Sequence, residues 1–291
     1  MDKTTRRAYS STNRAGRDYT ELYEAIRQSA GVQAPALIKH LTSSGITKWQ
    51  DLTKSRLFSF RDDLLEEVAP TSARTYFAVF KGVLARYEDD VDFCPDYRDI
   101  LRAKNEKPVK TYLTINELKR LEGVTTESTL ERQVLYQFLI GAYTGMRISD
   151  IRNVTEENVT GGQLSYVSKK TSVHAVVPCS DRVKGYILWV QQNEQDVSLA
   201  GYNKIVRRLC RKAGIADKVK VYRAGATCTG PKWQFVSSHT ARISFCTNLA
   251  ELHVPLLDIA RLAGHQNTST TERYVVNTKV NLPITAMKYF V

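Results

Sequence analysis

One interruption of the apolar pattern constrains the fold of this chain more than any other feature. Residues 103–112, "AKNEKPVKTY", are polar and basic, contain a proline and lack apolar periodicity, which is the composition of a linker. A chain of 291 residues is long enough to form two hydrophobic cores. We therefore expect a domain in residues 1–102, a basic linker in 103–112 and a larger domain in 113–291.

The first domain has the pattern of short amphipathic helices. Apolar side chains recur on one stripe of residues 17–29, and Gly45 is placed to end the next helix. Thr53 is a candidate N-cap for a helix that stops before Pro70. The longest segment, residues 71–90, has a broad apolar face. These signals predict a small all-helical domain.

The second domain mixes helices with short strands. Thr114 and Glu117 have the spacing of a capping box at the start of a helix, and residues 135–146 are strongly apolar. Alternating apolar residues between 164 and 177 predict a hairpin, and residues 217–236 predict an extra strand pair built from "VKVY" and "WQFV". The expected fold class is mainly α with a small β-hairpin or sheet component.

Positive charge is concentrated in the second domain. Residues 111–291 hold 23 Lys and Arg against 14 Asp and Glu, a net of +9 out of +12 for the whole chain. Such a charge suits a polyanion, most simply nucleic acid.

Other features exclude several classes of protein. The five cysteines are scattered and lack CxxC spacing, which argues against a disulfide framework and a cysteine-rich zinc site. Neither a membrane-length apolar run nor a secretory h-region is present in the sequence, so we expect a cytoplasmic protein with no membrane partner.

Four stretches of the second domain carry side chains suited to phosphodiester chemistry. They are "TGMRISDI", with Arg147; "SKKTSVHAVVP", with Lys169 and Lys170 near the hairpin turn; "SSHTARISF", with His239 and Arg242 on one helix face; and "LAGHQNTSTTERYV", with His265 and Tyr274. Guanidinium groups can hold the non-bridging oxygens, a lysine can protonate the leaving oxygen, and a phenol can attack phosphorus. Carboxylates are sparse there, Asp150 and Glu272 excepted, which favours a reaction without a metal or other cofactor.

The order and spacing of these stretches resemble the tyrosine recombinase (phage integrase) family, with motif coverage from about residue 113 to 280. The resemblance implies a helical, SAM-like core-binding domain followed by an α+β catalytic domain that breaks and rejoins DNA without metal or ATP. The lack of room for a separate arm-binding domain suggests a compact, Xer-like or mobile-element integrase that is bacterial, archaeal or phage-encoded.

The resemblance also implies residue roles. Arg147 and Arg242 would clamp the scissile phosphate, and Asp150 would support the first arginine. Lys170, with Lys169 as the fallback, would be the general acid. His239 would assist proton transfer, His265 would bind the phosphate, and Tyr274 would form a 3′-phosphotyrosyl link. Tyr289 is the next candidate nucleophile.

Further expectations concern DNA and partner subunits. We expect DNA contacts from the helical domain, the linker and the lysine hairpin, namely Arg74, Lys81, Lys107, Lys110 and Lys169. The expected partners are double-stranded DNA with a specific recombination site, possible DNA-bending accessory proteins, and three further copies of the chain. The last segment, 277–291, would dock on a neighbouring subunit in a homotetramer on two duplexes, with a monomer or weak oligomer free in solution.

Two other functions use the same features. A type IB topoisomerase-like enzyme would relax DNA without a defined site, and a non-catalytic DNA-binding protein would keep only the fold. The presence of all six candidate residues argues against the second alternative.

Overall fold

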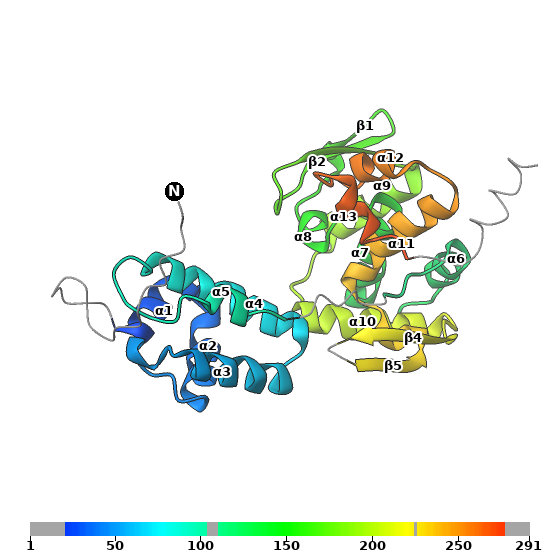
Figure 1. The fold of residues 1–291 in the computed structure, drawn as a ribbon. Helices are drawn as coiled ribbons and strands as arrows, with labels where there is room; N and C mark the ends of the chain where they lie inside the picture. Colours follow the sequence, from blue (N-terminus) through cyan, green and yellow to red (C-terminus); the bar gives the residue numbers. More distant parts are fainter. Residues whose placement is uncertain (1–20, 104–109, 224–225, 277–291) are drawn as a thin grey trace, which may run out of the picture. The chain divides into compact units, whose positions relative to one another are not determined.

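The computed structural model describes residues 21–103, 110–223 and 226–276. The chain divides into two compact units, one comprising Met1–Pro108 with Tyr222–Ala226 and the other Val109–Val221 with Thr227–Val291. Helices predominate in both and the strands are few and short (Figure 1), so the predicted fold class is confirmed.

The first unit is a helical bundle around one core. Edge-to-face contacts of Phe60 with Phe77 and Phe80 lie within that core, with ring centroids 6.0 and 5.7 Å apart. Its helices are α1 (Leu22–Ala30), α2 (Ala34–Ser43), α3 (Lys54–Glu67), α4 (Pro70–Arg86) and α5 (Tyr97–Ile100), with single 3-10 turns η1 (Gly31–Gln33) and η2 (Trp49–Asp51).

The helix-end signals of this unit are confirmed. The Thr53 hydroxyl accepts a hydrogen bond from the Arg56 backbone N–H at 3.4 Å, which caps α3. That helix ends before Pro70, which opens α4 at a position where a missing N–H costs nothing. Gly45 follows α2 with φ +71°.

The second unit is built around α7 (Thr129–Thr144). This helix packs against α9 (Asp181–Gln192), α10 (Leu199–Lys212) and α11 (Ser238–Glu251), and buries residues on nearly all sides (Figure 1). The remaining helices are α6 (Ile115–Glu122), α8 (Ile148–Ile151), α12 (Leu256–Leu262) and α13 (Thr268–Glu272), and the 3-10 turns are η3 (Glu156–Asn158) and η4 (Lys232–Phe235).

A small antiparallel sheet confirms the predicted hairpin. Its strands are β1 (Val159–Thr160), β2 (Gln163–Val167) and β3 (His174–Pro178), in that spatial order. Leu164 pairs with Val177 and Tyr166 with Ala175, and all four side chains are buried in one core cluster. The outer residues alternate with them, as a half-buried sheet requires.

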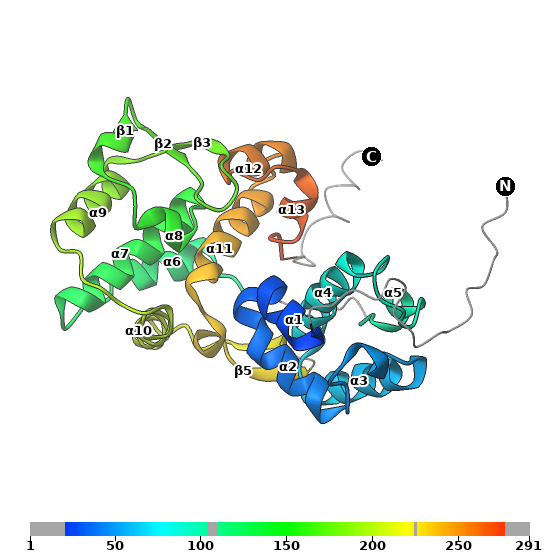
Figure 2. The ribbon, with the colours of Figure 1, turned by 90° about the vertical axis from the view of Figure 1, so that its left-hand side faces the viewer.

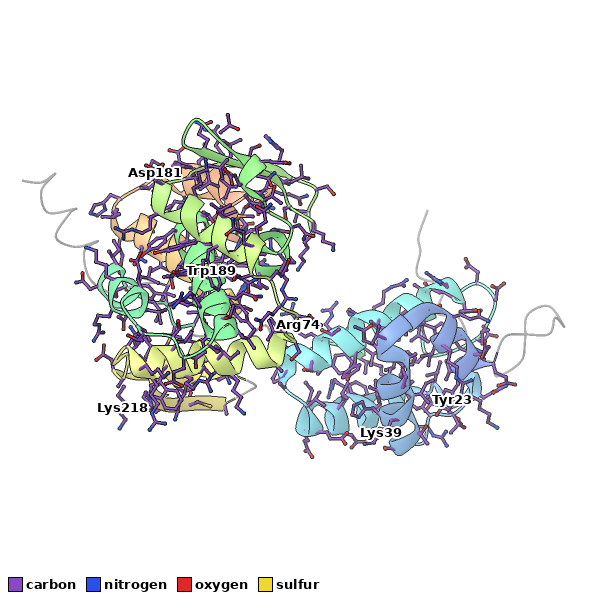
Figure 3. All side chains as sticks on the ribbon, turned by 180° about the vertical axis from the view of Figure 1, so that it is seen from behind. Tyr23, Lys39, Arg74, Asp181, Trp189 and Lys218 are labelled. Atoms are coloured by element: carbon purple, nitrogen blue, oxygen red, sulfur yellow. The ribbon has the colours of Figure 1, made fainter. Side chains whose placement is uncertain are left out.

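The second strand pair is only partly as expected. Its strands are β4 (Lys218–Arg223), which contains "VKVY" and begins at Lys218 (Figure 3), and β5 (Ala226–Pro231). The expectation that "WQFV" forms a strand is wrong, because residues 232–235 form the 3-10 turn η4. Trp233 and Val236 both pack into the same core, and a spacing of three places them on one side of a helical turn but not of a strand.

Gly145 ends α7 in a way that no other residue can easily reproduce. Its φ is +74°, the left-handed conformation of a C-cap, and its N–H donates to the Gly141 carbonyl at 3.0 Å. An added Cβ would lie 2.6 Å from Cδ1 of Phe245 on α11. The glycine therefore allows both the turn after α7 and the close approach of α11.

We expect Gly145→Ala to lower the free energy of unfolding by about 2 kcal/mol or more, since it combines a strained backbone with a steric clash. Chemical denaturation monitored by circular dichroism measures this change. Gly185→Ala on α9 is the matched control, because an added Cβ there meets no atom within 4 Å. The control should change stability by less than about 1 kcal/mol, in the stabilising direction. Equal effects at both positions would contradict the steric argument.

Candidate active site

Arg147 lies just beyond α7, at the N-cap position of the short helix α8, rather than in the apolar helix itself. Its guanidinium donates to the Ser168 hydroxyl at 3.0 Å, and that hydroxyl donates to Asp150 at 3.2 Å. The other carboxylate oxygen of Asp150 accepts the Lys169 backbone N–H at 3.0 Å. Asp150 and Ser168 are almost fully buried, so this hydrogen-bond chain fixes Arg147 against the β2–β3 turn.

The same turn carries the two candidate lysines. The Ser168 carbonyl accepts backbone N–H groups of Thr171 at 3.3 Å and Ser172 at 2.8 Å, which folds the segment tightly. The side chains of Lys169 and Lys170 are both exposed. The positive charge of Lys170 contributes to lowering the pKa of His239, which places Lys170 within electrostatic reach of the other candidate residues. This proximity favours Lys170 over Lys169 as the general acid, which stays a prediction.

Arg242 is the most buried of the candidate residues, with 1% of its surface exposed. One guanidinium nitrogen donates to the Gly145 carbonyl at 2.5 Å. Within the described residues, its Nε and Nη2 are buried without a hydrogen-bond partner. Buried donors without partners are costly, so a side chain held in this state is suited to an anion that would satisfy them. Burial and then the charge of Arg147 lower the pKa of Arg242.

His265 follows a glycine that the local geometry requires. Gly264 has φ +63° after α12, and an added Cβ would lie 3.3 Å from Cβ of Ala175 on β3. The His265 Nδ1 is 2.9 Å from the Thr271 hydroxyl, while its Nε2 is buried without a partner among the described residues. Burial first, then the charges of Arg242 and Arg147, lower the pKa of His265 to about 3.

Tyr274 follows α13, which Asn267 caps by accepting the Thr270 backbone N–H at 3.0 Å. The Tyr274 ring centroid lies 4.8 Å from that of His265 and 5.0 Å from that of His239. The guanidinium carbon of Arg242 lies 5.2 Å from the same centroid.

The structure thus brings His239, Arg242 and His265 around the ring of Tyr274, although the four residues come from three helices and the turns after them. In Figure 2, α11 lies beside α12, and α12 packs on α13, so the residues that follow α12 and α13 return to α11. The motif with His239 and Arg242 and the motif with His265 and Tyr274 therefore form one site through the packing of α11 with α12.

Positive charge dominates the site. The pKa of His239 is lowered to about 4, first by partial burial and then by the charges of Lys110, Arg242, Arg147 and Lys170. The His239 side chain still reaches the surface. A cluster of cations around a neutral, accessible imidazole favours an anionic ligand and leaves a proton acceptor beside it.

Lys110, predicted as a DNA contact, lies beside the candidate nucleophile, and its contact with DNA stays a prediction. Its ammonium donates to the Arg273 carbonyl at 2.5 Å and lies 5.1 Å from the Tyr274 ring centroid. Ser168 is the other residue that sequence reasoning missed, because a lone serine before two lysines carries no signal of its own.

The remaining predicted DNA contacts stay predictions. Arg74 is exposed on α4 (Figure 3), and Lys81 is half-buried on the same helix. Lys107, Tyr289 and the 277–291 tail lie outside the described residues. In the described part of the chain, groups of three or more His, Cys, Asp or Glu that could hold a metal ion are absent, as are helices able to cross a membrane.

Comparison with known proteins defines the family. The model of the phage integrase family matches residues 111–280, more than half of the chain, and the protein belongs to that family. A curated relative, the tyrosine recombinase XerD of Oceanobacillus iheyensis, is 24% identical over 203 residues. The match covers 62% of this chain and 62% of that relative, so the chain spans less than two thirds of its length.

Solved structures share the fold of nearly the whole chain. A lambda integrase (75-356) dimer bound to a COC' core site has a TM-score of 0.65 at 14% identity, covering 90% of this chain and 97% of that one. A lambda integrase tetramer bound to a Holliday junction has a TM-score of 0.60 at 14% identity, covering 87% and 75%.

The buried neutral state of His265 makes stability depend on pH. Below about pH 6.5 the unfolded histidine takes up a proton, while the folded one stays neutral down to about pH 3. Its stabilising contribution is therefore fully present above pH 6.5 and is lost as the pH falls. Between pH 6.5 and 5, His265 should lower the unfolding free energy of the wild-type protein by about 1.5 kcal/mol, and His265→Gln should lack this part of the decrease.

Urea denaturation at several pH values measures this difference. His174→Gln, at an exposed position on β3, is the matched control and should keep the wild-type pH dependence. An unchanged pH dependence in His265→Gln would show that folding does not lower the pKa of His265.

Proposed function

We propose that this protein is a tyrosine recombinase, which cleaves and rejoins DNA at a specific site through a 3′-phosphotyrosyl intermediate. The observation that carries the proposal is the joint placement of a phenol, two imidazoles and a buried guanidinium with unpartnered donors. This set matches what attack on a phosphodiester needs without a metal.

In this scheme Arg242 and Arg147 bind the non-bridging oxygens of the scissile phosphate. The unpartnered N–H groups of Arg242 would become satisfied, and negative charge growing on those oxygens would strengthen the bonds in the transition state. His265 would add a hydrogen bond from Nε2, which requires Nε2 to carry the ring proton and Nδ1 to accept from Thr271. The Ser168–Asp150 chain would keep Arg147 in place.

The nucleophilic step forms one P–O bond and breaks one. Tyr274 Oη would attack phosphorus and lose its proton to neutral His239, while Lys170 would protonate the departing 5′ oxygen. The products are a tyrosyl ester at the 3′ end and a free 5′ hydroxyl. Attack by a 5′ hydroxyl on that ester reverses the steps and releases Tyr274, so neither ATP nor another cofactor is consumed.

DNA recognition is the proposed task of the rest of the chain. The helical domain, residues 1–102, would be the core-binding domain, joined through the basic 103–112 linker to a catalytic domain with a net charge of +9. The proposed assembly is a homotetramer on two duplexes, with DNA-bending accessory proteins as further partners. The fold shared with a lambda integrase tetramer on a Holliday junction supports this assembly.

A nicked suicide substrate tests the chemistry, because loss of the short strand beyond the cleavage point traps the covalent intermediate. With a candidate site from the ends of the parent element, the wild-type protein should give a covalent protein–DNA band in EDTA, and Tyr274→Phe should give none. A band in both would move the nucleophile to another tyrosine, with Tyr289 tested next. Relaxation of a plasmid without the site would favour the topoisomerase alternative.

Binding of a phosphate should raise the pKa of His239, since its negative charge offsets the cations that lower that pKa to about 4. We expect a rise of about one unit or more when Tyr274→Phe binds the site, measured by NMR titration of labelled histidines. DNA with an uncharged methylphosphonate at the cleavage position is the matched control and should give a smaller rise. Equal shifts with both duplexes would place His239 away from the scissile phosphate.

A further inference from the structure

Lys110 touches the segment of the candidate nucleophile. Its ammonium donates to the carbonyl of Arg273, the residue directly before Tyr274, at 2.5 Å. The same ammonium lies 5.1 Å from the centroid of the Tyr274 ring, a cation–π distance. Both contacts lie within the second unit, and Lys110 and Arg273 are 163 residues apart along the chain.

The surroundings of Lys110 differ from those of a lysine that serves only to bind phosphate. Its side chain is half-buried, and burial followed by the charge of Arg273 lowers its pKa. Taking an ammonium partly out of water is unfavourable unless hydrogen bonds or charge compensate. The Arg273 carbonyl and the face of the Tyr274 ring provide that compensation.

The nucleophile segment depends on contacts of this kind. The preceding helix α13 has only five residues, too few to be stable alone. The Thr247 hydroxyl of α11 donates to the Tyr274 carbonyl at 3.3 Å and accepts the Val276 N–H at 3.1 Å. Lys110 thus binds the carbonyl of Arg273, and Thr247 binds the carbonyl of Tyr274 itself.

We propose that Lys110 is a positioning residue for Tyr274, fixing the peptide group before the nucleophile and placing a positive charge against its ring. The inference deepens the proposed function and rests on it. A misplacement of about 1 Å in a reacting group can cost on the order of 10²-fold in rate. Holding the phenol in place is therefore expected to act on the cleavage step itself.

This role and a DNA-contact role predict different kinetics. A lysine that only neutralises a phosphate contributes to affinity and to its salt dependence, with little effect on the rate once DNA is saturating. A lysine that positions Tyr274 changes the rate at saturating DNA and leaves affinity nearly unchanged.

The test compares Lys110→Met with wild type on the nicked suicide substrate, in single-turnover reactions at saturating DNA, and measures Kd separately by fluorescence anisotropy. We expect the rate of covalent-complex formation to fall about 10- to 100-fold, with Kd changed less than about threefold. Lys119→Met is the matched control, since it removes the same charge from an exposed position on α6 of the same unit, and its saturating rate should equal that of wild type.

Lys110→Arg distinguishes positioning from a general loss of structure, because it keeps the charge and a donor for the Arg273 carbonyl. We expect it to recover at least part of the rate lost in Lys110→Met. An unchanged saturating rate in Lys110→Met, or a rate in Lys110→Arg no higher than in Lys110→Met, would overturn the inference. Failure of the proposed function is separate: the wild-type protein would then form no covalent complex at all.

Discussion

The hydrogen bond from the Arg242 guanidinium to the Gly145 carbonyl joins the core of the second unit to its candidate site. Gly145 ends the buried helix α7, lets Phe245 of α11 approach, and presents its carbonyl to Arg242, three residues earlier on the same α11. Arg147 follows two residues later, so one glycine places both arginines. Helix α7 packs on α11, α9 and α10, which is the largest set of helix contacts among the described residues of the domain. This packing fixes the geometry of the arginine pair.

The site concentrates charge in a way that works against folding. Arg242 is buried with donors unpartnered among the described residues, His265 is buried and neutral, and several cations surround His239. These features cost stability in the free protein, as is common where a site is shaped for a ligand rather than for the apo state. The Asp150–Ser168–Arg147 chain offsets part of that cost by giving Arg147 a fixed partner.

The sequence was most informative where a structural feature depends on residues that are close together along the chain. The capping box at Thr114, the Thr53 cap and the hairpin of β2 and β3 follow from short-range rules, and the structure confirms each. His239 and Arg242 lie three apart on a helix, so their shared face was predictable as well. The prediction of a strand at "WQFV" was wrong because its apolar residues fit a strand pattern, whereas the packing of Trp233 and Val236 favours a helical turn.

Long-range contacts could not be predicted in the same way. Ser168 meets Asp150 only because the β2–β3 turn folds against α8, and Lys110 meets Arg273 only after the whole domain is packed. Neither residue type is distinctive, and no periodicity links positions so far apart. The order and spacing of the motifs predicted the roles of their residues. The contacts that support those residues could be found only in the folded structure.

The short helix α13 has a consequence for how the tyrosine is presented. A five-residue helix contributes little stability of its own, so the segment is held by a few side-chain bonds from Lys110 and Thr247. Local opening of this segment breaks these bonds and the contacts of the Tyr274 ring, which costs far less than unfolding the domain. Tyr274 can therefore leave its seat without unfolding of the domain, while the two arginines stay anchored at the end of α7 and on the packed helix α11.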